Sequence, residues 1–184
     1  PVIVSRAENN YGSRQFPEKA IPFWIMHAEA GQPLPVYGEG RQMRSWLHVR
    51  DHCEALLLLI ERGTPGEIYH VSAGVELENI ELAKSVLRLT KRPEDAITLV
   101  KDRPGHDFRY ALDAGKIRAL GFRPEFSGER FLSGLQETVA WYRKNLLWVA
   151  GLMQEHGVPN PHIASSALLL DSLRKKKMLI FGEG

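Results

Sequence analysis

The chain has 184 residues, 43% of them hydrophobic and 25% charged, with a formal net charge of +2. This composition is that of a folded globular protein, and the small charge argues against binding to nucleic acid or to an anionic membrane surface. The single cysteine, Cys53, excludes an internal disulfide and favours a reducing, cytoplasmic location, and no apolar run approaches the roughly 20 residues of a membrane span.

The first part of the chain alternates short apolar runs with amphipathic segments. Val2–Val4 has the pattern of a strand covered on both faces, and a polar loop is expected after it. Pro17 suits the first turn of a helix, which Gly31 is expected to stop. Two strands are then predicted over 34–38 and 44–49.

The alternation continues through the middle of the chain. Asp51 can cap a helix that ends at Gly63, and Asn79 is a suitable N-cap for a helix that runs to Thr90. The other predicted elements are strands over 67–71 and 97–100, a short helix ended by Gly121, and a long amphipathic helix over 131–146. Strands that alternate with helices indicate the α/β class.

The composition changes from Gly157, and we predict that a domain over 1–150 ends shortly before this point. The sequence GVPNPH at 157–162 indicates a linker over 151–176, with a short helix at 165–175. The apolar run Met178–Phe181 leads into a Gly-x-Gly turn, which is typical of the start of a dinucleotide-binding domain. We therefore expect 177–184 to be the first strand of a second Rossmann domain; the alternative is a basic tail.

Two polar segments could bind a ligand. Residues 8–19 follow a predicted strand, where α/β sheets place ligands, and their asparagines could bind hydroxyl or phosphate oxygens. An ordinary Asx-rich turn is the alternative. Arg44 opens a partly buried strand and needs an anionic partner, either a diphosphate or an acid such as Asp51 or Glu54.

A third polar segment, DRPGHDFRY at 102–110, places Arg103 and His106 around a rigid Pro-Gly turn. Both side chains could reach one anion, although a solvated charged loop is the alternative. The seven histidines are scattered and Cys53 has no partner, so no metal site is predicted. No nucleophile-elbow motif supports a Ser-His-Asp triad.

Together these segments resemble the C-terminal half of nucleoside-diphosphate-glucose 4,6-dehydratases, which belong to the extended short-chain dehydrogenase/reductase family. The resemblance spans about residues 2–148 and is carried by NNYGxxQFPEKxIP, LPVYGxGxQxRxWLHVxDH and DRPGHDxRYAxD. It implies an NAD-dependent elimination of water from dTDP-glucose or UDP-glucose, giving a 4-keto-6-deoxy sugar for rhamnose or other deoxysugar synthesis. It also implies a homodimer for the intact enzyme.

By position in these motifs, the resemblance implies a role for each of eleven residues. Asn10 matches a residue beside the nicotinamide of NAD. The residues that match substrate contacts are Asn9, Lys19 and Ala20, the base-binding Pro35, Val36 and Tyr37, the diphosphate-binding Arg44 and Arg103, and the further nucleotide contacts Asn79 and His106.

The sequence also departs from the family pattern. Ser13 stands in place of a proline, and the sequence YHVSAG at 69–74 differs from the usual YNIGG. Ser45 replaces an aspartate, which removes a possible partner of Arg44. The Gly-rich NAD turn, the Tyr-x-x-x-Lys pair and the Asp-Glu pair belong to an N-terminal half outside this sequence, so we name no catalytic residue and expect the segment alone to be inactive.

Several alternatives remain open. A UDP-sugar 4-epimerase or a UDP-glucuronate decarboxylase would use the same scaffold, and a non-catalytic nucleotide-sugar-binding segment is a third possibility. The sequence does not separate thymine from uracil as the base. The terminal Gly-x-Gly turn at 182–184 resembles the junction in plant-type rhamnose synthases, which favours UDP.

Overall fold

The computed structural model describes residues 1–102, 104–105, 107–156 and 171. The predictions made for Arg103 and His106 concern residues outside this set. The same holds for the predicted strand at 177–184 and for nearly all of the linker beyond 156, so these remain predictions.

The described residues form an α/β structure, as the sequence predicts. The strands are β1 (Val4–Ala7), β2 (Asn9–Tyr11), β3 (Leu34–Tyr37), β4 (Met43–His48), β5 (Ile68–Val71), β6 (Val75–Glu78), β7 (Ile97–Val100) and β8 (Arg109–Tyr110). The helices are α1 (Ala20–Glu29), α2 (Val49–Arg62), α3 (Asn79–Thr90), α4 (Gly115–Ala119), α5 (Phe131–Lys144) and α6 (Leu146–His156).

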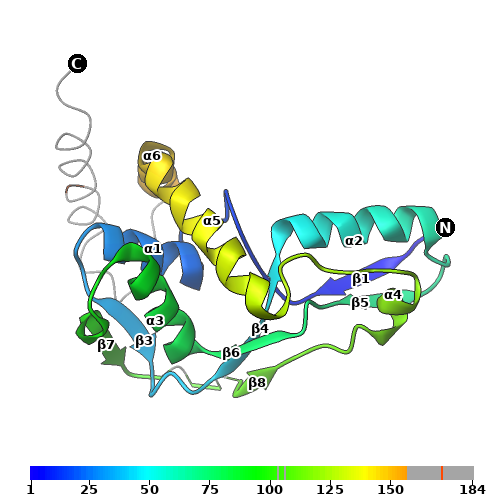
Figure 1. Ribbon diagram of the computed structural model, residues 1–184, viewed down its shortest axis with the longest axis horizontal. Coiled ribbons are helices and arrows are strands. Elements are labelled where there is room, and N and C mark those ends of the chain that lie inside the picture. Colours follow the sequence, from blue (N-terminus) through cyan, green and yellow to red (C-terminus); the bar gives the residue numbers. More distant parts are fainter. Residues whose placement is uncertain (103, 106, 157–170, 172–184) are drawn as a thin grey trace.

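The strands form three small sheets. The pairs β1–β5, β3–β7, β2–β4 and β4–β8 are parallel, whereas β6 pairs with β4 in antiparallel orientation. Figure 1 shows β1, β5 and α2 at one end of the molecule and β3, β7, α1 and α3 at the other. Strand β4 lies between these two ends and joins three of the other strands in one sheet.

The core lies where α1, α3 and α5 pack together behind β3. Helix α1 is buried along its length because both other helices contact it, and its Trp24 donates from Nε1 to the Pro35 carbonyl of β3 over 2.8 Å. Fully buried large apolar side chains each contribute about 1.5–3 kcal/mol to the stability of the folded protein. The largest of them here are Ile21, Ile25, Met26, Leu34, Leu82, Leu87, Leu135 and Tyr142.

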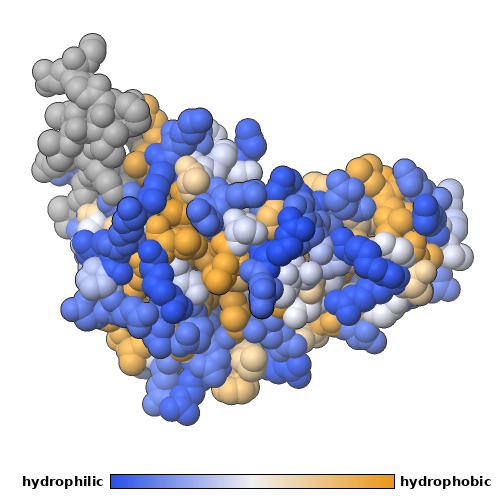
Figure 2. All heavy atoms as spheres, in the orientation of Figure 1, coloured by the Kyte–Doolittle hydropathy of each residue, from blue (hydrophilic) through white to orange (hydrophobic). Residues whose placement is uncertain are grey.

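The prediction of a strand at Val2–Val4 covered on both faces is wrong. The strand begins at Val4, which is 42% exposed, and Val2 is 70% exposed. Strand β1 pairs only with β5 among the described residues, so one side of this two-stranded sheet remains open. Apolar side chains are also exposed on neighbouring α2, including Leu57 and Ile60. Figure 2 shows apolar surface at this end of the molecule.

Three helix boundaries also differ from prediction. Helix α1 begins at Ala20 because Pro17 lies in a turn before it. Asn79 is the first residue of α3 and not its N-cap, since Glu78 still has extended backbone. The long helix predicted over 131–146 ends at Lys144, and a further helix, α6, follows from Leu146. Between them, the side chain of Asn145 donates to the Trp141 carbonyl.

Asp51 is not the cap of α2. The N-cap is His48, whose Nδ1 accepts a hydrogen bond from the Arg50 backbone N–H. The buried Asp51 carboxylate instead accepts the backbone N–H groups of Glu125 (2.8 Å) and Phe126 (3.0 Å). It thereby attaches the segment before α5 to the start of α2.

Candidate functional site

Strand β4 brings together three residues that the sequence assigns to nucleotide-sugar binding. Asn9 of β2 lies opposite Trp46, and Arg44 lies two residues earlier on the same strand. On the other side of β4, Met43 pairs with Glu78, the residue before Asn79. The sheet therefore places the asparagine, arginine and helix-start segments next to one another, although they are far apart in the sequence.

The side chain of Asn10 is held by two hydrogen bonds. Its Nδ2 donates to the Glu8 carbonyl (3.0 Å), and its Oδ1 lies 2.9 Å from Nδ1 of His52. Its backbone carbonyl also accepts from Nε2 of Gln15 (2.7 Å), and the Gln15 carbonyl in turn accepts from the hydroxyl of Tyr142. Asn10 is therefore fixed in position from both its backbone and its side chain.

The guanidinium of Arg44 is held by backbone carbonyls. It donates to Met43 O (2.7 Å) and to Asp107 O (2.8 Å), the latter just before β8. Within the part of the chain that the structure describes, no ion pair joins Arg44 to a carboxylate, and Asp51 is engaged elsewhere. The positive charge of Arg44 is thus positioned by neutral acceptors, and no acid among the described residues pairs with it.

Ser45 is the residue for which the sequence predicts the loss of an acidic partner of Arg44. It is fully buried, and its Oγ donates to the Tyr110 carbonyl (3.1 Å). Successive side chains of a strand point to opposite faces, so an aspartate at position 45 would lie on the other face of β4 from Arg44. The replacement by serine therefore does not remove a neighbour of the guanidinium.

The predicted base-binding segment is strand β3. Pro35 and Tyr37 are partly exposed, whereas the Val36 side chain is fully buried, so only the Val36 backbone could contact a ligand. The turn after β3 is attached to the segment after β7 because Nε2 of Gln42 donates to Asp102 (2.6 Å). This bond fixes the chain directly before position 103.

The remaining described site residues lie at helix starts. Lys19 occupies the N-cap position of α1, its side chain is 58% exposed, and it forms an ion pair with Glu18 (3.6 Å). Ala20 is the first residue of the same helix. The backbone N–H of Asn79 donates to the Gln42 carbonyl, which joins the start of α3 to the turn after β3.

Sequence reasoning gave no function to Glu8, which lies in the polar segment at 8–19 directly before the first motif. It is buried at the junction of β1 and β2, and this burial raises its pKa, although hydrogen bonds with Ser72 and Ser45 act in the opposite direction. His52 and Gln42 were also missed. The available signal for Gln42 and His52 was their place in the second quoted motif, but their partners, Asp102 and Asn10, are distant in the sequence.

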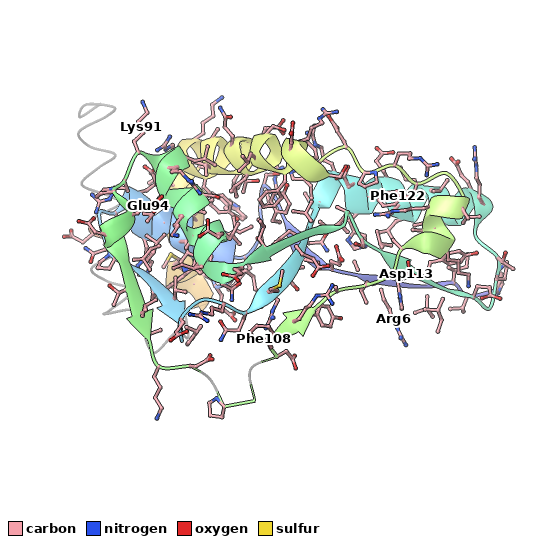
Figure 3. All side chains as sticks on the ribbon, turned by 60° about the horizontal axis from the view of Figure 1, so that its bottom comes forward. Arg6, Lys91, Glu94, Phe108, Asp113 and Phe122 are labelled. Carbon is pink, nitrogen blue, oxygen red and sulfur yellow. The ribbon has the colours of Figure 1, made fainter. Side chains whose placement is uncertain are left out.

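Other possible sites in the described residues do not involve these side chains. A cavity of about 550 Å³ lies beside α4 and is lined by Ala73, Arg118 and Phe122, the last of which is labelled in Figure 3. None of the nine predicted residues that the structure describes lines it. No group of three metal-binding side chains occurs among the described residues. None of the helices described is long and apolar enough to cross a bilayer.

Comparison with known proteins gives consistent matches. Residues 1–135 match the family described as GDP-mannose 4,6 dehydratase. A dTDP-glucose 4,6-dehydratase from Streptomyces niveus is 51% identical over 148 residues, which cover 80% of this chain and 43% of that protein. The structure of a dTDP-glucose 4,6-dehydratase from Bacillus anthracis in complex with NAD is 42% identical, with a TM-score of 0.77 over 83% of this chain and 48% of that one.

An epimerase is similar at a lower level of identity. The UDP-glucose 4-epimerase from Thermotoga maritima, solved with UDP-glucose, is 27% identical, with a TM-score of 0.73 over 78% of this chain and 46% of that one. The chain thus spans less than half the length of these relatives.

Proposed function

Because the chain belongs to the family described as GDP-mannose 4,6 dehydratase, we propose that it is the nucleotide-sugar-binding part of a dTDP-glucose 4,6-dehydratase. In the whole protein, NAD supplies the acceptor and donor of the hydride that leaves C4 of the glucose and returns at C6, with loss of water. The family resemblance implies that the acid and base groups of this reaction lie in the part of the whole protein that this chain does not span.

The observation that carries the proposal is the arrangement around β4. The amide of Asn9 and the guanidinium of Arg44 come from adjacent strands, and Arg44 has no carboxylate partner among the described residues. An amide suits a sugar hydroxyl, and a guanidinium without a paired acid suits a diphosphate, which it can bind with two parallel hydrogen bonds. A nucleoside-diphosphate sugar carries both groups next to each other.

The other residues complete the proposed site. Lys19 and Ala20 at the start of α1 would contact the sugar, and Pro35, Val36 and Tyr37 would enclose the base, the valine through its backbone. Asn79 would contact the nucleotide, and Arg103 and His106 would add to the diphosphate contacts. These roles rest on the family motifs and on the hydrogen bond that joins the start of α3 to the turn after β3.

Asn10 fits a role beside NAD. Its amide uses one N–H and its oxygen within the protein, which leaves one Nδ2 hydrogen to donate to a cofactor. This capacity suits an acceptor such as the carboxamide oxygen of nicotinamide. The proposal for the whole protein also includes a homodimer and a cytoplasmic location, the latter supported by the single cysteine.

Thymidine is proposed as the nucleoside because the relatives at 51% and 42% identity are dTDP-glucose enzymes, whereas the UDP-glucose epimerase is 27% identical. Titration of the intact protein with dTDP and with UDP tests this choice, and tighter binding of dTDP is expected. Equal affinities would contradict a nucleoside preference set by β3.

The reaction itself is tested by incubating the intact protein and NAD with dTDP-glucose and analysing the sugar by mass spectrometry. We expect the product to have lost one water. A product of unchanged mass with inverted C4 would identify an epimerase, the second candidate, which the epimerase neighbour favours.

A further inference from the structure

The side chain of His52 contacts the residue that the proposed function places beside NAD. His52 lies in the first turns of α2, and its Nδ1 is 2.9 Å from Oδ1 of Asn10, forty-two residues earlier in the chain. The same Asn10 amide donates from Nδ2 to the Glu8 carbonyl over 3.0 Å. These two bonds determine what the amide can offer to a ligand.

The orientation of the Asn10 amide follows from the Glu8 carbonyl. A carbonyl oxygen only accepts hydrogen bonds, so the amide group that faces it must be the NH₂ group. Turning the amide by 180° would bring its oxygen against the Glu8 carbonyl, with two acceptors in contact. The oxygen of Asn10 must therefore be the atom that faces His52.

The protonation of His52 follows in turn. Since the Asn10 oxygen is an acceptor, Nδ1 of His52 must carry the hydrogen. Burial lowers the pKa of His52, which favours a neutral ring, and a neutral ring with a proton on Nδ1 has none on Nε2. Helix α2 holds the ring in place because it begins directly after β4 and contacts β2.

We propose that His52 is a positioning residue that fixes the Asn10 amide with one N–H directed to the cofactor. This inference rests on the proposed function, because it takes Asn10 as the residue beside the nicotinamide. Without the bond from His52, the Glu8 carbonyl is the one remaining partner of the Asn10 amide. This single bond does not prevent the amide from rotating. The remaining Nδ2 hydrogen would then no longer be held toward an acceptor of NAD.

Three variants of the intact protein separate positioning from a general effect on folding. His52→Asn places an amide NH₂ close to the position of Nδ1 and retains the donor, whereas His52→Leu removes it at similar volume. Cys53→Ala changes the exposed neighbour on the same helix and serves as the control. The thermal midpoint of each variant shows whether it is folded.

The first readout needs no cofactor. In ¹⁵N NMR spectra of the wild-type protein, we expect the His52 ring to carry its proton on Nδ1. A ring protonated only on Nε2 would overturn the proposal, because Nδ1 could not then donate to Asn10.

The second readout is NAD binding and turnover. His52→Leu should weaken NAD binding about fivefold, the ratio that one neutral hydrogen bond supplies, and lower kcat while leaving KM for dTDP-glucose unchanged. His52→Asn should restore most of the affinity, and Cys53→Ala should equal the wild type. Equal NAD affinity in His52→Leu and the wild type would overturn the proposal. A wild-type protein that binds no NAD would overturn the proposed function, while the NMR result would still decide the His52–Asn10 bond.

Discussion

Removal of the Asp51 carboxylate should strongly destabilise the protein. This buried carboxylate accepts two backbone N–H groups, from Glu125 at 2.8 Å and from Phe126 at 3.0 Å. A hydrogen bond to a charged group contributes about 1.5–3 kcal/mol, and a buried N–H without an acceptor adds a desolvation penalty. Because the N–H of Glu125 can regain water, we expect Asp51→Ala to lower the free energy of unfolding by about 3–4 kcal/mol.

The loss should also extend toward the site. The ring centroids of Phe126 and His48 are 4.2 Å apart, and those of His48 and Tyr11 on β2 are 5.0 Å apart. Release of the segment at 125–126 should therefore loosen packing beside β2.

Urea unfolding followed by tryptophan fluorescence measures the Asp51 effect. Asp113→Ala is the matched control, because Asp113 is exposed and accepts a single N–H, from Gly115 at 2.8 Å. The decrease in unfolding free energy in Asp113→Ala should be well under half of the decrease in Asp51→Ala. Equal losses in the two variants would refute the reasoning that burial and two acceptors make Asp51 the stronger attachment.

Three further predictions concern the site and the stability of the fold. Arg44→Met should weaken dTDP binding about 10- to 100-fold in calorimetry, the scale of a charged hydrogen bond. Arg109→Met is the control and should leave dTDP binding unchanged, because Arg109 is paired with Glu76. Equal effects of the two substitutions would contradict the role of Arg44. Gly40→Ala should cost about 2–4 kcal/mol in urea unfolding, because φ is +74° and the new Cβ would lie 2.8 Å from Ile80 and Val36. Gly66→Ala, with φ +89° and open space, should cost only the backbone strain; an equal cost would exclude a clash at position 40. Burial lowers the pKa of His27, so the unfolded chain binds a proton more readily than the folded protein, and stability falls as pH drops below about 6.5. In His27→Asn, the difference in unfolding free energy between pH 7.5 and pH 5.5 should therefore be smaller than in the wild type. An undiminished difference would contradict this role of His27.

Much of the fold could be predicted because local patterns agree with the tertiary structure. The helix α3 and the strands β3, β5 and β7 have apolar periodicities and turn residues that identify them without reference to the rest of the chain. Strands β2 and β6 were missed because both are short, and because NNY is polar while VELE has only two apolar residues. Pairing with β4 makes them strands, and such long-range pairing is not visible in local propensity.

The site shows the same division. The motifs located Asn9, Asn10 and Arg44, and the structure places these residues on adjacent strands. The partners could not be predicted, since Asp51 bonds residues 74 and 75 positions away and Arg44 bonds the carbonyl of Asp107. Asp51 was assigned to the nearest helix start because local capping is the usual role of an aspartate there.

The central claim is tested most directly by following a hydride. The intact protein is incubated with NAD and dTDP-glucose carrying deuterium at C4, and the product is examined by NMR. The proposed function predicts that the deuterium is recovered at C6 of a 4-keto-6-deoxy sugar. Deuterium that remains at C4 of a recovered sugar with inverted configuration would contradict it.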